Sequence, residues 1–136
     1  MNENILDLLY ELKKKCVISD DAFMLKADLT QAEYHFFIAI SSCDEINSAL
    51  IAKKMDLSLS RVSRVLDKLV KRKFLIRKTN SNDRRAIKLK LTKEGEELKK
   101  QIEEYRKDCE YKITNSLSGK ELADIKKSFY RVLDLL

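Results

Sequence analysis

Residues 58–92 read SLSRVSRVLDKLVKRKFLIRKTNSNDRRAIKLKLT and predict a helix followed by a β-hairpin. At residues 59–73 apolar side chains recur at helical spacing, whereas the other positions carry Arg, Lys and Ser with a single Asp, and Glu is absent. Residues 74–78 and 86–91 change to alternation in steps of two, which is typical of paired strands, around a polar connection at residues 79–85. The sequence therefore predicts a cationic helix beside an exposed, basic hairpin, which we call the wing.

The middle of the chain is strongly basic. Residues 53–90 contain 14 Lys and Arg against three Asp, a balance of +11, whereas the whole chain carries +6. The residues outside this window therefore sum to −5, so that a basic middle is flanked by acidic arms. A polyanion is the natural counterpart of such a footprint, although a solvated basic face would have the same composition.

Composition favours a mainly helical chain. With 136 residues, 44% hydrophobic content, no Pro and two Gly, it fits one compact domain, alone or with helical extensions. No apolar run approaches the roughly 18 residues of a membrane span, and no export signal opens the chain, so we expect a cytoplasmic protein without a membrane partner. Three Cys with no Cys-x-x-Cys spacing argue against a disulfide framework or a structural zinc site.

Capping residues predict a helix-turn-helix that includes the cationic helix. Thr30 and Glu33 form a capping box, which predicts a helix that begins there and ends near Ser42. Asn47 is expected to cap a short helix, and residues 56–58 form a tight polar connection from it to the cationic helix. Two helices joined by about three residues describe a helix-turn-helix.

Both ends of the chain carry apolar stripes that the helix-turn-helix leaves uncovered. Residues 5–12 begin a first helix, which we expect to be interrupted around residues 19–21. Thr92 is expected to cap a long helix, and Ser118 with Glu121 forms a second capping box at the start of a final helix with a wide apolar face. These faces must bury against each other or against a second copy of the chain.

This order of elements resembles the MarR family of bacterial transcriptional regulators. The resemblance rests on Leu57-Ser58 before the cationic helix and above all on residues 83–92, DRRAIKLKLT, where an Asp-x-Arg motif leads into a strand that ends in Leu-Thr. It is close over residues 30–98 and covers the terminal helices by layout only. It implies a mainly α fold with a small β-hairpin, a winged helix-turn-helix flanked by dimerisation helices. The expected regions are residues 1–29 (N-terminal dimerisation), 30–92 (DNA-binding lobe) and 93–136 (C-terminal dimerisation).

The resemblance also implies a function. We expect a homodimer that binds a pseudo-palindromic site on double-stranded DNA as a sequence-specific transcriptional regulator, acting as a repressor that an effector releases. The cationic helix would enter the major groove. Its candidates for contacts with base edges are Ser58, Ser60, Arg61, Ser63 and Arg64.

The wing would provide a second point of contact. The Asp-x-Arg match falls on Asp83 and Arg85, which implies that Arg85 enters the minor groove while Asp83 steers its guanidinium, with Arg84 beside them. Alternatively, Asp83 only shapes the turn and Arg85 is solvated. The candidates for phosphate contacts are Lys68, Arg77 and Lys78.

Members of the family often respond to small aromatic acids, oxidants or metal ions. Cys16 follows residues 13–15, which are all Lys, and neighbouring cations favour a reactive thiolate, so Cys16 is a candidate redox sensor or else an ordinary thiol. An aromatic effector would need a pocket, although aromatic residues at helical spacing also serve as plain core. The candidates for its lining are Tyr10, Tyr34, Phe37 and Tyr105. His35 is the sole histidine, so we expect no metal site.

An enzyme is not expected. The sequence contains no Gly-rich phosphate loop and no recognisable nucleophile motif, so we expect neither catalysis nor a cofactor. The competing class is a winged-helix module that binds another protein. Such a module would not need Arg and Lys in both the helix and the wing.

Overall fold

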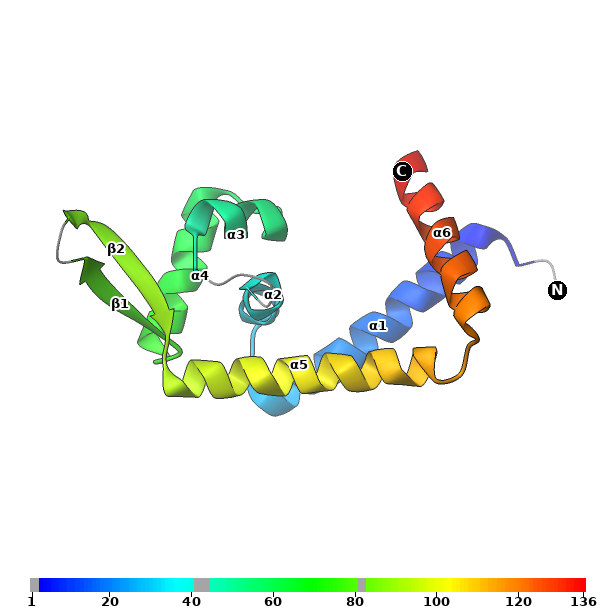
Figure 1. The fold of residues 1–136 in the computed structure, drawn as a ribbon, viewed down its shortest axis with the longest axis horizontal. Helices are drawn as coiled ribbons and strands as arrows, with labels where there is room; N and C mark the ends of the chain where they lie inside the picture. The colour runs from blue at the N-terminus through cyan, green and yellow to red at the C-terminus, as the bar shows by residue number, and fades with distance from the viewer. Residues whose placement is uncertain (1–2, 41–44, 81–82) are drawn as a thin grey trace. The chain divides into compact units, whose positions relative to one another are not determined.

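The elements follow the predicted order, mainly helices with one small antiparallel hairpin (Figure 1). The computed structural model describes residues 3–40, 45–80 and 83–136, with residues 79, 80 and 83–87 described by their backbone only. The elements are α1 (Ile5–Ala27), α2 (Gln31–Ile40), α3 (Ser48–Met55), α4 (Leu59–Lys71), β1 (Leu75–Asn80), β2 (Asp83–Leu91), α5 (Lys93–Thr114) and α6 (Gly119–Leu135). The chain divides into two compact units, residues 1–102 and 103–136, and the boundary falls within α5.

The predicted helix caps are confirmed. The Thr30 amide donates to Glu33 Oε1 (3.1 Å), and the Glu33 amide donates to Thr30 Oγ1 (3.2 Å), which completes the capping box of α2. Asn47 accepts from the first amides of α3, and Ser58 accepts from the Arg61 amide at the start of α4. The expected end of α2 near Ser42 lies outside the described residues.

Helix α1 is continuous, and the expected interruption at residues 19–21 is wrong. Ser and Asp inside a helix each cost at most about 0.7 kcal/mol relative to Ala. In addition, Asp20 accepts a hydrogen bond from the Tyr34 hydroxyl (3.4 Å), and Phe23 packs against the Tyr34 ring with 5.9 Å between centroids. The last turns of α1 therefore dock onto α2 and end only at Asp28, which adopts the left-handed conformation (φ 54°).

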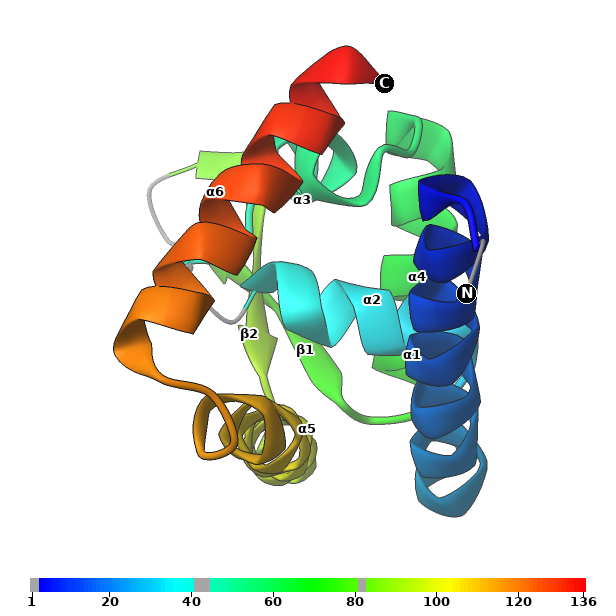
Figure 2. The ribbon, with the colours of Figure 1, turned by 90° about the vertical axis from the view of Figure 1, so that its right-hand side faces the viewer.

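The core of the first unit lies where α2, α3 and α4 pack together (Figure 2). Its fully buried side chains come from α2, α3, α4, β1 and the first part of α5. They are Tyr34, Phe36, Phe37, Ile51, Val62, Leu69, Leu75 and Ile102. Burying these large apolar groups is the main stabilising term for the unit, and it fixes which side of α4 remains outside.

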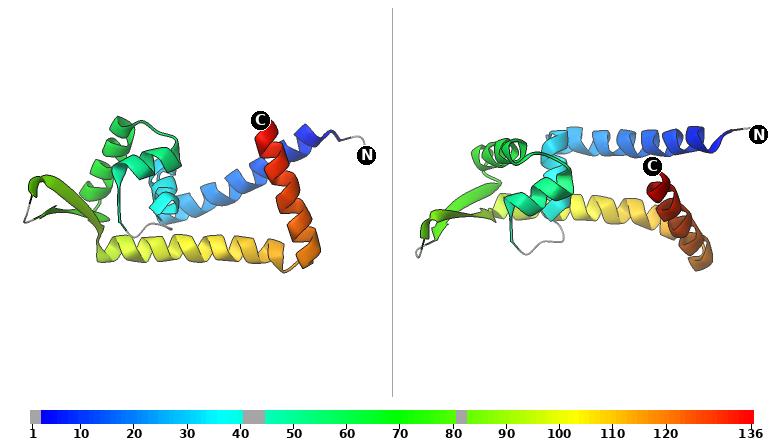
Figure 3. Two further views of the ribbon diagram at one scale, coloured as in Figure 1. Left: turned by 45° about the horizontal axis from the view of Figure 1, so that its top comes forward. Right: turned by 90° about the horizontal axis from the view of Figure 1, so that it is seen from above.

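The wing is the antiparallel pair β1–β2, which projects beyond α4 in both views of Figure 3. Leu75 pairs with Leu91 and Lys78 pairs with Lys88, with an irregularity in register between Thr79 and Asn80. Both strands extend further towards the tip than expected, because backbone pairing continues through the polar residues. The predicted connection at residues 79–85 was therefore too long, since only residues 81–82 separate the strands.

The base of the wing is closely packed. The Phe74 carbonyl accepts from the Thr92 amide (3.0 Å), and the Thr92 hydroxyl donates to the Lys73 carbonyl (2.5 Å) and accepts from the Gly95 amide (3.1 Å). Thr92 therefore caps α5 as predicted. A Cβ on Gly95 would lie 2.2 Å from the Phe74 carbonyl oxygen, so this close approach of α5 to the wing requires glycine.

The second unit contains the rest of α5 and helix α6. Ser118 and Glu121 form the predicted capping box at the start of α6. No residue of α6 is buried, although every position of this helix is described. Phe129 is 43% exposed and Leu133 67% exposed. Among the described residues, no helix is both long and apolar enough to cross a membrane.

Candidate nucleic-acid interface

Helix α4 has one buried face and one exposed cationic face. Val62 and Leu69 are 0% exposed, and Leu66 is buried beside them. All five residues predicted to contact bases, and the predicted phosphate contact Lys68, lie on the exposed part of this helix or at its cap; they are Ser58, Ser60, Arg61, Ser63, Arg64 and Lys68. The core therefore orients α4 so that its hydroxyl and guanidinium groups are presented together.

The N-terminal end of α4 is suited to an anion. Ser58 caps this end, and its hydroxyl lies 3.1 Å from that of Ser60, either of which can donate. The helix dipole adds partial positive charge at this end, which the nearby Arg61 and Arg64 reinforce. No acidic residue lies in the first turn of α4. Phosphate oxygens and acceptor atoms on base edges are the groups that such a surface binds.

The wing contributes two exposed cations on one of its faces. Lys78 and Lys88 are directly opposite on paired strands, and both are exposed. Like charges in directly opposite positions destabilise a sheet unless a counterion offsets them. Arg77 on the other face is bonded to Asp67 of α4, a contact that the sequence did not predict. The predicted phosphate contact Arg77 is therefore already engaged by a carboxylate that ties the wing to α4.

The predicted wing-tip residues are placed only by their backbone. Asp83, Arg84 and Arg85 begin strand β2, with Asp83 opposite Asn80, and their side chains lie outside the described part of the structure. These residues belong to a hairpin whose first strand, β1, packs against α4.

The four predicted pocket residues belong to the helices α1, α2 and α5. Tyr34 and Phe37 are core residues of the first unit, and Tyr10 is exposed on α1. Tyr105 belongs to the second unit and is half-buried. A cavity of about 480 Å³ in the first unit involves none of them; its lining is Ile40, Glu45, Ile46, Lys78, Lys88, Leu89, Lys90, Leu91, Glu96 and Lys99.

The remaining sensor candidates have simple surroundings. Cys16 is exposed on α1, which leaves its thiol accessible. His35 is exposed on α2 beside the Tyr34 ring. Among the described residues, no group of three or more His, Cys, Asp or Glu side chains is arranged to hold a metal ion.

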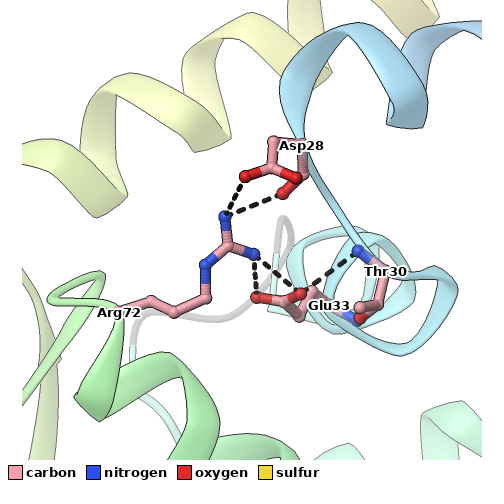
Figure 4. A network of polar contacts seen from close by, with 4 residues as sticks. All are labelled: Asp28, Thr30, Glu33 and Arg72. Atoms are coloured by element: carbon pink, nitrogen blue, oxygen red, sulfur yellow. Dashed lines mark hydrogen bonds and ion pairs between the residues drawn. The ribbon is translucent and has the colours of Figure 1, made fainter.

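A polar network at the other end of α4 was missed by sequence reasoning. Arg72, the C-cap of α4, donates through Nη1 to both carboxylate oxygens of Glu33 (2.8 and 2.6 Å) and through Nη2 to the Asp28 carbonyl (2.7 Å), as Figure 4 shows. Glu33 is 2% exposed. Its capping box was visible in the sequence, whereas a partner 39 residues away was not.

Comparison with known proteins identifies proteins that are similar to this chain in sequence and in fold. The MarR family model matches residues 29–87. The transcriptional regulator SarZ of Staphylococcus aureus is 23% identical over 127 residues, which cover 92% of this chain and 83% of SarZ. The multiple antibiotic resistance protein MarR of Escherichia coli is 26% identical over 112 residues, covering 82% of this chain and 78% of that protein.

Solved structures share the fold over almost the whole chain. FabT of Streptococcus pneumoniae in complex with DNA superimposes with a TM-score of 0.84 at 20% identity, covering 96% of this chain and 94% of FabT. The reduced form of MarR from E. coli gives a TM-score of 0.71 at 24% identity and covers 98% of both chains. The predicted winged helix-turn-helix is therefore confirmed.

Proposed function

Because this chain is a member of the MarR family of DNA-binding transcriptional regulators, we propose that it acts as a homodimer on a pseudo-palindromic site in double-stranded DNA. The observation that carries the proposal is the exposed face of α4, where hydroxyl and guanidinium groups gather while the opposite face is buried. The fold match to FabT in complex with DNA and to a MepR variant bound to an oligodeoxyribonucleotide supports the same conclusion.

The roles of the α4 residues follow from their positions. Ser58, Ser60, Arg61, Ser63 and Arg64 occupy the end of α4 that would enter the major groove, where side chains reach base edges. Lys68 and Lys78 would contact phosphates, which position the protein without reading sequence. Arg77 is bonded to Asp67. We therefore assign Arg77 the role of holding the wing against α4.

The wing tip would read the minor groove. Arg85 offers a planar fork of donors, and a narrow minor groove concentrates the negative potential that attracts it. Asp83 would orient that fork, and Arg84 would contact the adjacent phosphates. Support for this assignment comes from the Asp-x-Arg motif and from a basic hairpin whose base is fixed to α4.

Dimerisation would use the apolar faces of the terminal helices. Residues of α1 such as Ile5 and Leu12, and of α6 such as Phe129 and Leu133, are exposed. Soluble chains seldom leave such faces uncovered, and a second copy presents the same faces by symmetry. The proposed division is 1–29 and 93–136 for dimerisation and 30–92 for DNA binding. An effector would release the protein from its site.

The test separates sequence reading from general attraction. A duplex selected from a random pool by the wild-type protein is compared with an unselected duplex over a range of salt concentrations. Arg64→Ala should weaken binding to the selected duplex by about 1–3 kcal/mol per subunit and relax base preference at one position. Lys78→Ala should weaken binding to both duplexes alike and reduce the salt slope by about one per subunit.

Two outcomes would contradict the proposal. Equal losses on both duplexes for both variants would remove the division between base and phosphate contacts. A complete absence of wild-type binding to random duplex at low salt would favour the alternative, a winged-helix module that binds another protein.

A further inference from the structure

The C-terminal end of α4 is tied to the junction between α1 and α2 by one side chain. Arg72 bonds to Glu33 of α2 and to both the carbonyl and the carboxylate of Asp28, which ends α1 (Figure 4). Its guanidinium also lies 5.1 Å from the centre of the Phe74 ring, which packs edge-on against Phe37. Groups from three helices and from the start of the wing therefore converge on Arg72.

The chemistry of this junction requires arginine. The guanidinium is a planar fork, so Nη1 can bind Glu33 while Nη2 binds Asp28, on a different element. A lysine ammonium is a single point charge and cannot hold both acceptors in fixed directions. Because one acceptor is the backbone carbonyl of Asp28, the C-cap of α1, the contact fixes where α1 ends relative to α4.

The burial of Glu33 explains why its carboxylate needs the ion pair with Arg72. Its carboxylate is almost fully buried, and a buried charge needs a partner that is both ionic and hydrogen-bonded. Oε1 also accepts from the Thr30 amide, so the same carboxylate caps α2 and holds Arg72. The direction of α2 at its first turn and the position of the α4 terminus are therefore set by one group.

Helix α4 is long enough that a change of angle at one end would move the proposed base-contact residues at the other end. Helix α4 has 13 residues and is thus about 20 Å long. A tilt of about 10° at its Arg72 end would displace the opposite end, which carries Arg61 and Arg64, by about 3 Å. This displacement approaches the roughly 3.4 Å of helix axis that each phosphate of one DNA strand occupies, which is one base-pair step.

From this geometry we propose that Arg72 is a positioning residue that sets the angle of α4 relative to α1, and thereby the half-site spacing that the protein accepts. The inference rests on the proposed function. Arg72 itself contacts Glu33 and Asp28 and lies at the opposite end of α4 from the proposed base contacts. Its effect on DNA is exerted through the orientation of α4.

The experiment compares Arg72→Lys with Glu33→Gln. Both variants keep the side-chain size, and the glutamine can still cap α2 through its amide oxygen, but each removes the two-armed ion pair. Binding is measured to the selected duplex, to the same duplex with its half-sites moved apart by one base pair, and to random duplex. Far-ultraviolet circular dichroism and thermal unfolding report the fold.

The proposal expects a specific pattern. Each variant should lose about tenfold or more in affinity for the selected duplex, as expected when base contacts are displaced. Each should retain random-duplex affinity within about twofold, because the phosphate contacts remain. The wild-type preference for the original spacing should shrink in both. The double variant should be no worse than either single variant, because both break one contact.

Matched controls use the second capping box and a surface arginine. Glu121→Gln makes the same change in the capping box of α6, whose carboxylate has no arginine among its hydrogen-bond donors in the described residues. Arg106→Lys makes the same exchange at an exposed position of α5. Both controls should bind all three duplexes as the wild type does.

Two results would overturn the proposal. An unchanged spacing preference in folded Arg72→Lys and Glu33→Gln, even with lower thermal stability, would show that the network only stabilises the fold. An equal loss on selected and random duplex would show that Arg72 acts as a direct phosphate contact. Failure of the wild type to bind any duplex would instead remove the proposed function.

Discussion

Helices α4 and α6 carry similar patterns but differ in what covers their apolar faces. In α4, Val62 and Leu69 are fully buried by the rest of the first unit. In α6, every position of which is described, Ile125, Phe129 and Leu133 remain exposed, and so does Leu136, its C-cap. The same helical spacing of apolar residues therefore has two outcomes. The apolar face of α4 is buried within the chain, whereas the apolar face of α6 is exposed.

This difference in burial suits the two helices to different proposed roles. Because the core fixes the inward face of α4, its outward face is held rigidly and can present Arg61 and Arg64 in defined positions. Helix α6 gains little from its own chain, so its apolar face is available to a second copy, as we propose. In our proposal, α4 provides the surface that contacts bases, and α6 provides the contact that pairs two copies of the chain.

The largest expected effect comes from charging the uncovered face. Phe129→Glu with Leu133→Glu should convert the proposed dimer into a monomer, because two carboxylates per chain would have to be buried without partners. A monomer engages one half-site at a time, so affinity for the selected duplex should fall by about 10²–10⁴-fold. Light scattering after size exclusion gives the mass, and mobility-shift titration gives the affinity.

A charge-matched control tests the other side of α6. Lys127→Gln with Arg131→Gln also lowers the charge by two units but changes positions away from Phe129 on the helix. This variant should keep the wild-type mass. If the glutamate variant also kept it, the contrast between α4 and α6 would fail, since the exposed face of α6 would then have no partner.

The next effect compares the two glycines, one in each unit. Gly95→Ala places a Cβ 2.2 Å from the Phe74 carbonyl oxygen, a backbone atom that also accepts from the Thr92 amide. Either α5 or the wing must shift, so the free energy of unfolding should fall by about 1–3 kcal/mol, as for other overpacked sites. Urea denaturation followed by circular dichroism measures it.

Gly119 is the matched position at the start of α6. No atom lies within 4 Å of a Cβ built there. Gly119→Ala should therefore leave the stability unchanged or raise it by about 0.5 kcal/mol, since alanine favours the helix. Similar losses in the two variants would mean that the base of the wing has room to adjust.

Local patterns in the sequence were enough to predict most elements. Thr30, Asn47, Thr92 and Ser118 cap helices where expected because each cap depends on residues within three positions. The cationic face of α4 was likewise predicted from helical spacing alone. The fold and the position of the candidate interface were therefore accessible before any coordinates.

What the sequence could not predict depends on contacts between distant residues. Glu33 was assigned only to its capping box, and its partner Arg72 was counted as one more cation of the basic stretch. Arg77 was predicted to contact phosphate, and its ion pair with Asp67 was not predicted. In each case an ion pair depends on the angle between two packed elements, and no local pattern encodes that angle.

A further expected effect is a gain in stability at the junction that follows α4. Lys73 adopts φ 64°, a left-handed conformation that costs a residue with a Cβ about 1–2 kcal/mol. Lys73→Gly keeps the backbone groups that bond to Val70 and Thr92. Allowing for the greater freedom of glycine in the unfolded chain, the net gain in the free energy of unfolding should be about 0.5–1 kcal/mol.

The control is Asp56→Gly, at φ 54°, which should gain less stability because Asp tolerates this conformation. Urea denaturation measures the free energy of unfolding of both variants. A larger gain for Lys73→Gly would show that the backbone is strained where α4 meets the wing. Equal gains would show that Lys73 is no more strained than Asp56.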